Sequence, residues 1–401
     1  MLRPDTFALT ALLALLTAIG PLSVDLYLPS LPEIGRVLGA PTAEVQLTIS
    51  SYLIGFAGGQ IIYGPVSDIY GRKRILLLSL VLFCAATLAC AFASSIEMLI
   101  AARAIQAIGA SGAVVLARAV VRDLYNGARA GRELSLMGMI MGIAPVVAPS
   151  IGGVLQTLFG WRACFLFVCA AGVLAIAVVW RLLPETLRDK PRESFAFSEL
   201  FRAYGLVARN RGFLAHLALV SVSFAGLFAF ISGSPFVLQN FFGLTPIGFA
   251  LAFAVAAGGY IVGTSVAAQF VMRAGLDRTI GAGAVALCLG GLAATVTTAV
   301  VPSSAAGLVL PMTLYMAGLG LAMPQALAGA LQPFPDHAGT ASSLVGFVQQ
   351  TFAAVAGAVV GHLLATTAWP LVLIVTVSGC LTLIIWVLTR GVRTALSRPL
   401  S

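Results

Sequence analysis

The chain has 401 residues, of which 60% are hydrophobic and only 9% charged, and its net charge is +9. Soluble proteins carry about 25% charged residues, so this composition excludes a soluble fold and indicates a chain that crosses a membrane many times. A positive balance indicates nucleic-acid binding in a soluble protein, but here we assign it to loops that face anionic lipid, and we expect no nucleic-acid partner.

Twelve apolar stretches are each long enough to cross a bilayer, which takes roughly 20 residues in a helix. They cover residues 7–29, 43–63, 75–94, 97–118, 133–159, 162–183, 212–236, 247–271, 280–300, 307–330, 339–365 and 369–390. We therefore predict an all-α membrane protein with twelve transmembrane helices. The predicted parts are an N-terminal six-helix bundle (1–183), a cytoplasmic central loop (184–211) and a C-terminal six-helix bundle (212–401).

Two charged residues stand inside these spans. Asp25 lies near the outer end of span one, and Arg103 lies in span four with Gln106 one turn further on. A charge inside the bilayer costs about 2.5–3.5 kcal/mol on insertion scales, so it usually serves a pathway or a pair. The two residues lie at comparable depths, which predicts one shared cavity. The alternative for Asp25 is an interfacial residue just outside the hydrocarbon.

Two helix faces carry aromatic and polar side chains at helical spacing. Tyr52, Phe56 and Gln60 follow one another in span two, and Phe224 and Phe228 do so in span seven. Residues four apart share a face of a helix, so these side chains are candidates for a cavity lining. A packed helix interface explains the same spacing equally well.

The loop between spans two and three reads G-P-V-S-D-I-Y-G-R-K-R at 64–74. We expect Gly64 and Pro65 to end span two, because proline lacks a backbone donor and clashes with the preceding turn. Gly71 permits a tight reversal, and Arg72, Lys73 and Arg74 then place three positive charges before span three.

The string of that loop resembles the cytoplasmic loop signature of the major facilitator superfamily. It matches at Gly64, Asp68, Gly71 and Arg72. The resemblance implies that this cluster holds the two halves together on the cytoplasmic side when the cavity faces out. If the loop served only to fix the orientation of the spans in the membrane, its basic residues would be explained but Asp68 would not.

A stripe of small residues and prolines runs along span five. Gly138, Gly142, Pro145, Pro149 and Gly153 lie on one face, which lets another helix approach closely and lets the helix bend. Ordinary helix packing would explain the periodicity as well. The segment, which also contains Gly152, resembles the span-five signature of facilitator-type antiporters, and this resemblance implies export rather than import.

The two halves show traces of a repeat. A glycine and a tryptophan stand eight residues apart before span six, at Gly153 and Trp161, and again before span twelve, 208 positions later. The string R-A-G-L-D-R after span eight is a weak copy of the loop at 64–74, and its Gly275 follows Gly71 by 204 positions. Near-equal offsets indicate a duplicated six-helix unit.

Basic residues gather in alternate loops, all on the side of Arg72. The positive-inside rule places these loops in the cytoplasm, and an even number of spans then puts both termini there. The basic residues lie at positions 118–132, 188–211, 273–278 and 390–398, whereas the other side holds only Arg36 and Arg162.

Several strings resemble the Bcr/CflA family of drug-resistance exporters within the major facilitator superfamily. They are V-D-L-Y-L-P-S-L-P at 24–32, R-A-V-V-R-D-L-Y at 118–125, S-F-A-G-L-F-A-F-I-S-G-S-P-F-V at 223–237 and F-P-D-H-A-G-T-A-S-S-L at 334–344. The resemblance implies a multi-pass protein of the bacterial inner membrane that exports amphipathic antibiotics such as bicyclomycin, phenicols or sulfonamides in exchange for protons. It also implies that Asp25 and Arg103 take part in coupling and substrate binding.

The remaining function classes find less support. No two of the three histidines stand at a metal-ligand spacing, and no phosphate-binding G-x-x-x-x-G-K-[ST] motif occurs, so we expect neither an enzyme nor an ATP-driven pump. We expect no metal and no cofactor, with the proton gradient as the energy source and a monomer as the functional form. The alternative function is a secondary importer or a metabolite exporter of the same fold.

Overall fold

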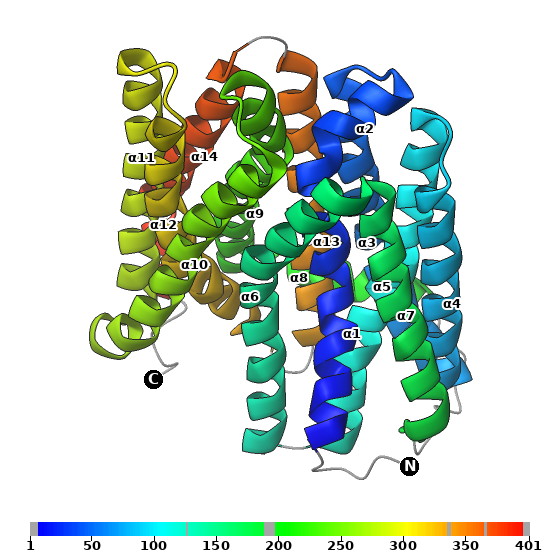
Figure 1. Cartoon of the computed structure of the whole chain (residues 1–401). Coiled ribbons are helices and arrows are strands. Elements are labelled where there is room, and N and C mark those ends of the chain that lie inside the picture. The colour runs from blue at the N-terminus through cyan, green and yellow to red at the C-terminus, as the bar shows by residue number, and fades with distance from the viewer. Residues whose placement is uncertain (1–6, 126, 188–196, 335–337, 365–366, 396–401) are drawn as a thin grey trace. The chain divides into compact units, whose positions relative to one another are not determined.

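The computed structural model describes residues 7–125, 127–187, 197–334, 338–364 and 367–395, and every regular element in these ranges is helical. The chain divides into two compact units, Met1–Phe195 and Ala196–Ser401, which we call unit 1 and unit 2. Figure 1 labels their helices along the chain. Among the described residues, eleven helices are long and apolar enough to cross a membrane, and the shorter apolar segment Ile143–Phe159 brings the total to the predicted twelve.

The described residues of unit 1 form six long helices and two short ones. The long helices are α1 (Phe7–Asp25), α3 (Thr42–Tyr70), α4 (Arg72–Ala91), α5 (Ile96–Leu124), α6 (Gly127–Phe159) and α7 (Arg162–Leu182). Between α1 and α3 lie a 3-10 turn, η1 (Leu28–Ser30), and α2 (Leu31–Leu38). Pro29 and Pro32 break the apolar run here, because each removes a backbone donor from the helix ladder.

Unit 2 repeats the set of six long helices and adds three short elements. The long helices are α9 (Arg211–Phe236), α10 (Pro246–Ala274), α11 (Leu276–Val300), α12 (Ala305–Leu331), α13 (Ala338–Leu363) and α14 (Trp369–Leu388). The short elements are α8 (Phe197–Ala208), the π-helical turn η2 (Val237–Phe241) and α15 (Arg390–Ala395). Helix α8 lies within the polar segment predicted as the central loop, and it packs against α9 and α13.

The six long helices of each unit pack in the same pattern. In unit 1, α5 contacts α3 and α4, α4 contacts α7, and α1 contacts α5, α6 and α7. In unit 2, α12 contacts α10 and α11, α11 contacts α14, and α9 contacts α12, α13 and α14. The contacts thus match helix by helix in chain order, which confirms the predicted pair of pseudo-symmetric six-helix bundles.

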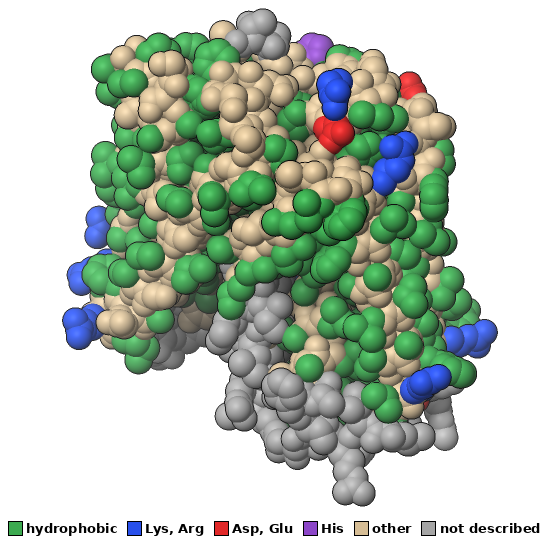
Figure 2. Space-filling view, in the orientation of Figure 1, with side chains coloured by type: hydrophobic (Ala, Val, Ile, Leu, Met, Phe, Trp, Pro, Cys, Tyr) green, Lys and Arg blue, Asp and Glu red, His purple; other side chains and the backbone are tan. Residues whose placement is uncertain are grey.

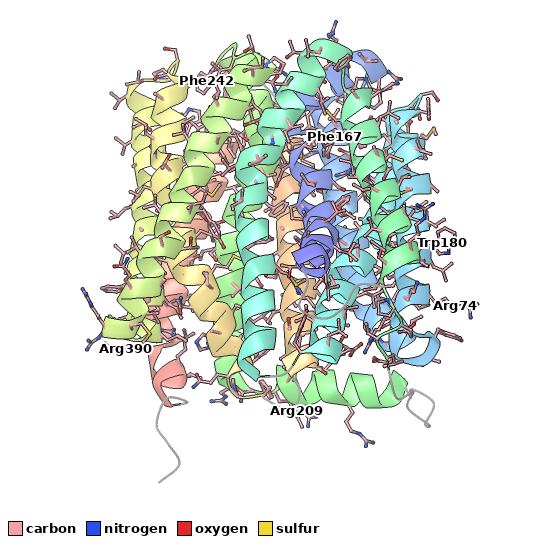
Figure 3. All side chains as sticks on the ribbon, turned by 60° about the horizontal axis from the view of Figure 1, so that its bottom comes forward. Arg74, Phe167, Trp180, Arg209, Phe242 and Arg390 are labelled. Atoms are coloured by element: carbon pink, nitrogen blue, oxygen red, sulfur yellow. The ribbon has the colours of Figure 1, made fainter. Side chains whose placement is uncertain are left out.

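The outer surface follows from the environment of the helices. Large apolar side chains such as Leu174, Trp180 and Leu310 are more than half exposed, as expected where lipid replaces water. On the face shown in Figure 2, hydrophobic side chains cover the helices and Lys and Arg lie near helix ends. Figure 3 shows Arg209 and Arg390 at one end of unit 2 and Phe242 at the other.

The prediction that Gly64 and Pro65 end the second span is wrong. Helix α3 runs through Pro65 to Tyr70. The Ser67 hydroxyl donates to the Gly64 carbonyl at 2.7 Å within this helix, and α3 packs against α5. Membrane helices tolerate proline where serine side chains and neighbouring helices satisfy the freed backbone groups. The reversal instead occurs at Gly71, whose φ of 96° favours a residue without Cβ.

Candidate functional site

The buried centre of unit 1 is the side chain of Arg103, which is 0% exposed. Its guanidinium carbon lies 4.4 Å from the ring centroid of Tyr27 and 4.2 Å from that of Tyr52. A third ring, that of Phe165, lies at 5.9 Å. A desolvated cation–π contact contributes about 2 kcal/mol, so these rings offset part of the cost of burying the charge.

A chain of hydrogen bonds orients the same guanidinium. Arg103 Nη1 donates to the Ser23 carbonyl at 2.9 Å and to Gln106 Oε1 at 2.6 Å. Gln106 Nε2 donates in turn to the Thr87 hydroxyl at 2.9 Å. Positions 103 and 106 stand three apart on α5, which puts both side chains on one face. The chain thereby connects α1, α5 and α4 around one cation.

The two tyrosines are held by hydrogen bonds of their own. The hydroxyl of Tyr27 lies 3.0 Å from that of Thr48, and the Tyr52 hydroxyl donates to the Gly20 carbonyl at 3.2 Å. Nε and Nη2 of Arg103 have no hydrogen-bond partner among the described residues. Both nitrogens are buried beside the aromatic rings.

Asp25 is the last residue of α1 and is 4% exposed, so the surrounding protein covers its side chain. It lies two residues from Ser23, whose carbonyl binds Arg103. The structure thus brings the two predicted residues to one region of unit 1. Among the described residues no ion pair joins them directly.

Helix α6 approaches α1 next to Asp25. A Cβ added to Gly152 would lie 1.7 Å from the Leu26 carbonyl oxygen, so only glycine allows this contact between the two backbones. Pro145 and Pro149 lie within the helix, and Gly153 is buried. Gly138 and Gly142 belong to α6, but their surroundings lie outside the described residues.

The other cavity candidates belong to different units. In unit 1, Tyr52 and Phe56 are buried with ring centroids 6.1 Å apart, and Gln60 is half-buried. In unit 2, the rings of Phe224 and Phe228 lie 4.8 Å apart. Phe56 packs against Gly20 of α1, which is the packed interface that the sequence left open as an alternative.

The loop signature forms a second cluster in unit 1, centred on Arg72, whose side chain is 8% exposed. Its Nη2 lies 2.5 Å from Asp68 Oδ1, and its Nε lies 3.0 Å from Asp123 Oδ2. The Thr186 hydroxyl donates to the same Asp123 oxygen at 3.0 Å. Three helices and the segment after α7 therefore meet at one guanidinium.

Glu185 completes this cluster from the segment that follows α7. It accepts from the backbone N–H of Arg72 at 2.9 Å and of Lys73 at 3.2 Å, the first amides of α4. These amides have no partner inside the helix, and the helix dipole favours a negative charge there. A Cβ added to Gly71 would lie 2.6 Å from Glu185 Oε2, so glycine gives the carboxylate its access.

Sequence reasoning missed Tyr27, Asp123, Glu185 and Thr186 as members of these clusters. Tyr27 stands two residues after Asp25, and Asp123 stands in the quoted string at 118–125. Glu185 and Thr186 directly follow the sixth span. A search for charged and aromatic residues at span ends would have found Tyr27, Asp123 and Glu185 as candidates, but it would have missed Thr186 and would not have paired any of them.

The comparisons with known proteins agree with this architecture. The chain matches the Major Facilitator Superfamily over residues 13–358. It is 31% identical to "Multidrug resistance protein D" of Escherichia coli over 96% of both chains, and 29% identical to "Bicyclomycin resistance protein homolog" of Haemophilus influenzae over 92% of both. The crystal structure of a D-xylose-proton symporter superposes with a TM-score of 0.74 at 17% identity, covering 95% of this chain and 97% of that chain.

Proposed function

The chain belongs to the major facilitator superfamily of membrane transporters, and on that premise we propose that it exports amphipathic antibiotics or other small drugs in exchange for protons. Relatives that align over nearly their whole length bear names of multidrug and bicyclomycin resistance proteins, which supports a drug substrate. The symporter at 17% identity bears on the fold alone.

The observation that carries the proposal is a buried arginine bound to the Ser23 carbonyl, two residues along the chain from a buried aspartate. Nε and Nη2 of Arg103 suit an acceptor oxygen of a drug, such as a carbonyl or a sulfonyl group. The rings of Tyr27 and Tyr52 hold the guanidinium and add apolar surface beside it. A site of this kind combines one orienting polar group with hydrophobic walls.

Asp25 is the proposed proton carrier. Antiport requires a group that binds a proton in one state of the cycle and releases it in another, and a carboxyl does so. Arg103 keeps its charge throughout, so the state of Asp25 changes the net charge of the site. The membrane potential supplies about 2.3 kcal/mol per charge per 100 mV, which drives drug accumulation when one proton enters for each neutral drug that leaves.

The location and orientation follow from the same proposal. We place the protein in the bacterial inner membrane, as a monomer with both termini in the cytoplasm. The basic residues at positions 118–132, 188–211, 273–278 and 390–398 support this orientation under the positive-inside rule.

Drug-dependent proton flux and counterflow in proteoliposomes test the proposal. Asp25→Asn should abolish uphill drug transport and the drug-induced proton signal, while downhill drug exchange partly survives because the helices still rearrange. Arg103→Ala should weaken binding as well as coupling. Glu97→Gln, which changes an exposed carboxylate at the start of α5, is the matched control and should behave as wild type.

Two results decide against the proposal. If Asp25→Asn still concentrates drug in response to an imposed pH difference, Asp25 is not the coupling group. If the wild-type protein shows no drug-induced proton signal with any phenicol, sulfonamide or bicyclomycin, the alternative of an importer or a metabolite exporter takes its place.

A further inference from the structure

We infer that Arg393 and Asp277 act as positioning residues for transport, by clasping the C-terminal helix α15 to the start of α11 in unit 2. We call Arg393, Asp277, Trp386 and Thr389 the C-terminal clasp. The inference rests on the proposed transport function, but it concerns residues outside the site around Arg103.

The contacts of Arg393 use every nitrogen of its guanidinium. Nε donates to Asp277 Oδ1 at 2.8 Å, Nη2 donates to the Trp386 carbonyl at 2.7 Å, and Nη1 donates to the Thr389 hydroxyl. Trp386 Nε1 donates to the Asp277 carbonyl at 3.1 Å. The Arg393 side chain is only 1% exposed. Arginine side chains are rarely buried this deeply unless they are paired, so the contacts of Arg393 hold it at a defined place in unit 2.

The clasp occupies the place in unit 2 that Glu185 occupies in unit 1. Arg393 follows Glu185 by 208 positions, and Asp277 follows Lys73 by 204. These are the two offsets that relate Trp161 to its counterpart and Gly71 to Gly275. Each unit therefore links the segment after its sixth long helix to the start of its third.

The polarity of this link is reversed between the units. In unit 1 the acid, Glu185, follows the sixth helix and binds the start of α4, with Lys73 donating to the Trp180 carbonyl at 2.9 Å. In unit 2 the base, Arg393, follows the sixth helix and the acid, Asp277, begins the third. The same two positions are joined in both units, by a carboxylate on backbone amides in unit 1 and by a side-chain ion pair in unit 2, which indicates that the link itself matters rather than a particular residue.

A physical role follows from the helices that the clasp joins. Helix α11 packs on α14, α14 packs on α9, and α15 contacts α9 as well. Alternating access is largely a movement of rigid bundles, so a bundle whose helix ends separate transmits that movement poorly. Breaking a buried ion pair leaves an uncompensated charge, which would release α15 and loosen the ends of α11 and α14.

Charge reversal of the full-length protein tests the clasp. Arg393→Glu and Asp277→Arg should each raise amide hydrogen exchange in residues 389–393 by about tenfold. The maximal drug transport rate should fall by about the same factor, with little change in KM. The double reversal should restore both readouts towards wild type. Arg273→Glu, an exposed arginine at the end of α10, is the control and should change neither.

An alanine cycle covers the case in which reversed charges do not fold. The double variant Arg393→Ala with Asp277→Ala should lose no more of the transport rate than the worse of the two single variants. If the two losses multiply instead, the residues do not act as a pair. If amide hydrogen exchange rises while the transport rate stays unchanged, the residues of the clasp do not act as positioning residues for transport. If the wild-type protein carries no drug, the proposed function fails, while exchange and thermal unfolding still report whether the clasp exists.

Discussion

The close contact between α6 and α1 makes Gly152→Ala the sharpest test of the structure. The added Cβ would lie 1.7 Å from the Leu26 carbonyl oxygen, whereas real Cβ atoms keep at least 3.0 Å, so the two backbones must part by more than an ångström. Overpacking of this kind costs about 1–3 kcal/mol. The gain from replacing a helical glycine, about 1 kcal/mol, offsets only part of that cost.

The functional loss should exceed the loss of stability, because Leu26 adjoins Asp25. Displacing a reacting group by about 1 Å can reduce a rate about 100-fold, so we expect drug-driven proton exchange to fall at least about tenfold in everted vesicles. The unfolding temperature in detergent should fall as well. Gly58→Ala is the matched control, since a Cβ there meets nothing within 4 Å, and it should leave both readouts unchanged. If the Gly152→Ala protein exchanges protons for drug at the wild-type rate, α6 and the end of α1 do not approach each other as described.

Two further predictions concern the cluster around Arg72. Asp68→Asn removes the charge of an ion pair whose acid is 41% exposed, so the free energy of unfolding should change by no more than about 1 kcal/mol. Most transport should be lost while drug binding remains, which efflux and ligand-binding assays on the same preparation check. Unchanged efflux would mean that the loop serves only to fix the orientation of the protein in the membrane. Glu185→Gln weakens the cap on the first amides of α4 and should destabilise the protein by about 0.5–2 kcal/mol. Thermal unfolding measures this loss, with the exposed Glu97→Gln change as a comparison. An unfolding temperature equal to that of the wild type would contradict the capping role.

Much of the architecture could be predicted from composition and spacing. A lipid-exposed helix must satisfy its own backbone hydrogen bonds and needs roughly 20 apolar residues. Hydropathy alone therefore placed the twelve spans on the long helices observed, although the second span was predicted to end seven residues before α3 does. Equal offsets between related strings revealed the repeat, which the packing pattern of the two units then matched. The prediction at Pro65 was wrong because it applied a rule for isolated helices to a helix that continues through the proline within a packed bundle.

The sequence also singled out Asp25 and Arg103, because an ionisable residue inside an apolar span is costly enough to be conspicuous by itself. It could not show what surrounds them. The rings of Tyr27 and Tyr52 around Arg103, and the binding of its Nη1 by the Ser23 carbonyl, join residues more than 50 positions apart. Such contacts depend on how helices pack, which the pattern along one helix does not encode.

At the helix ends, too, the sequence indicates some members of each cluster, whereas the packing of the helices determines the others. Sequence patterns marked Asp68, Gly71 and Arg72 as a unit, since they are neighbours along the chain. Only the tertiary structure brought Glu185 to the first amides of α4 and Arg393 to Asp277, across 113 and 116 positions. Hydropathy specifies which segments cross the membrane, because that depends on each segment alone. The pairing of charges at their ends depends on which helices become neighbours, and that is decided by packing within each bundle.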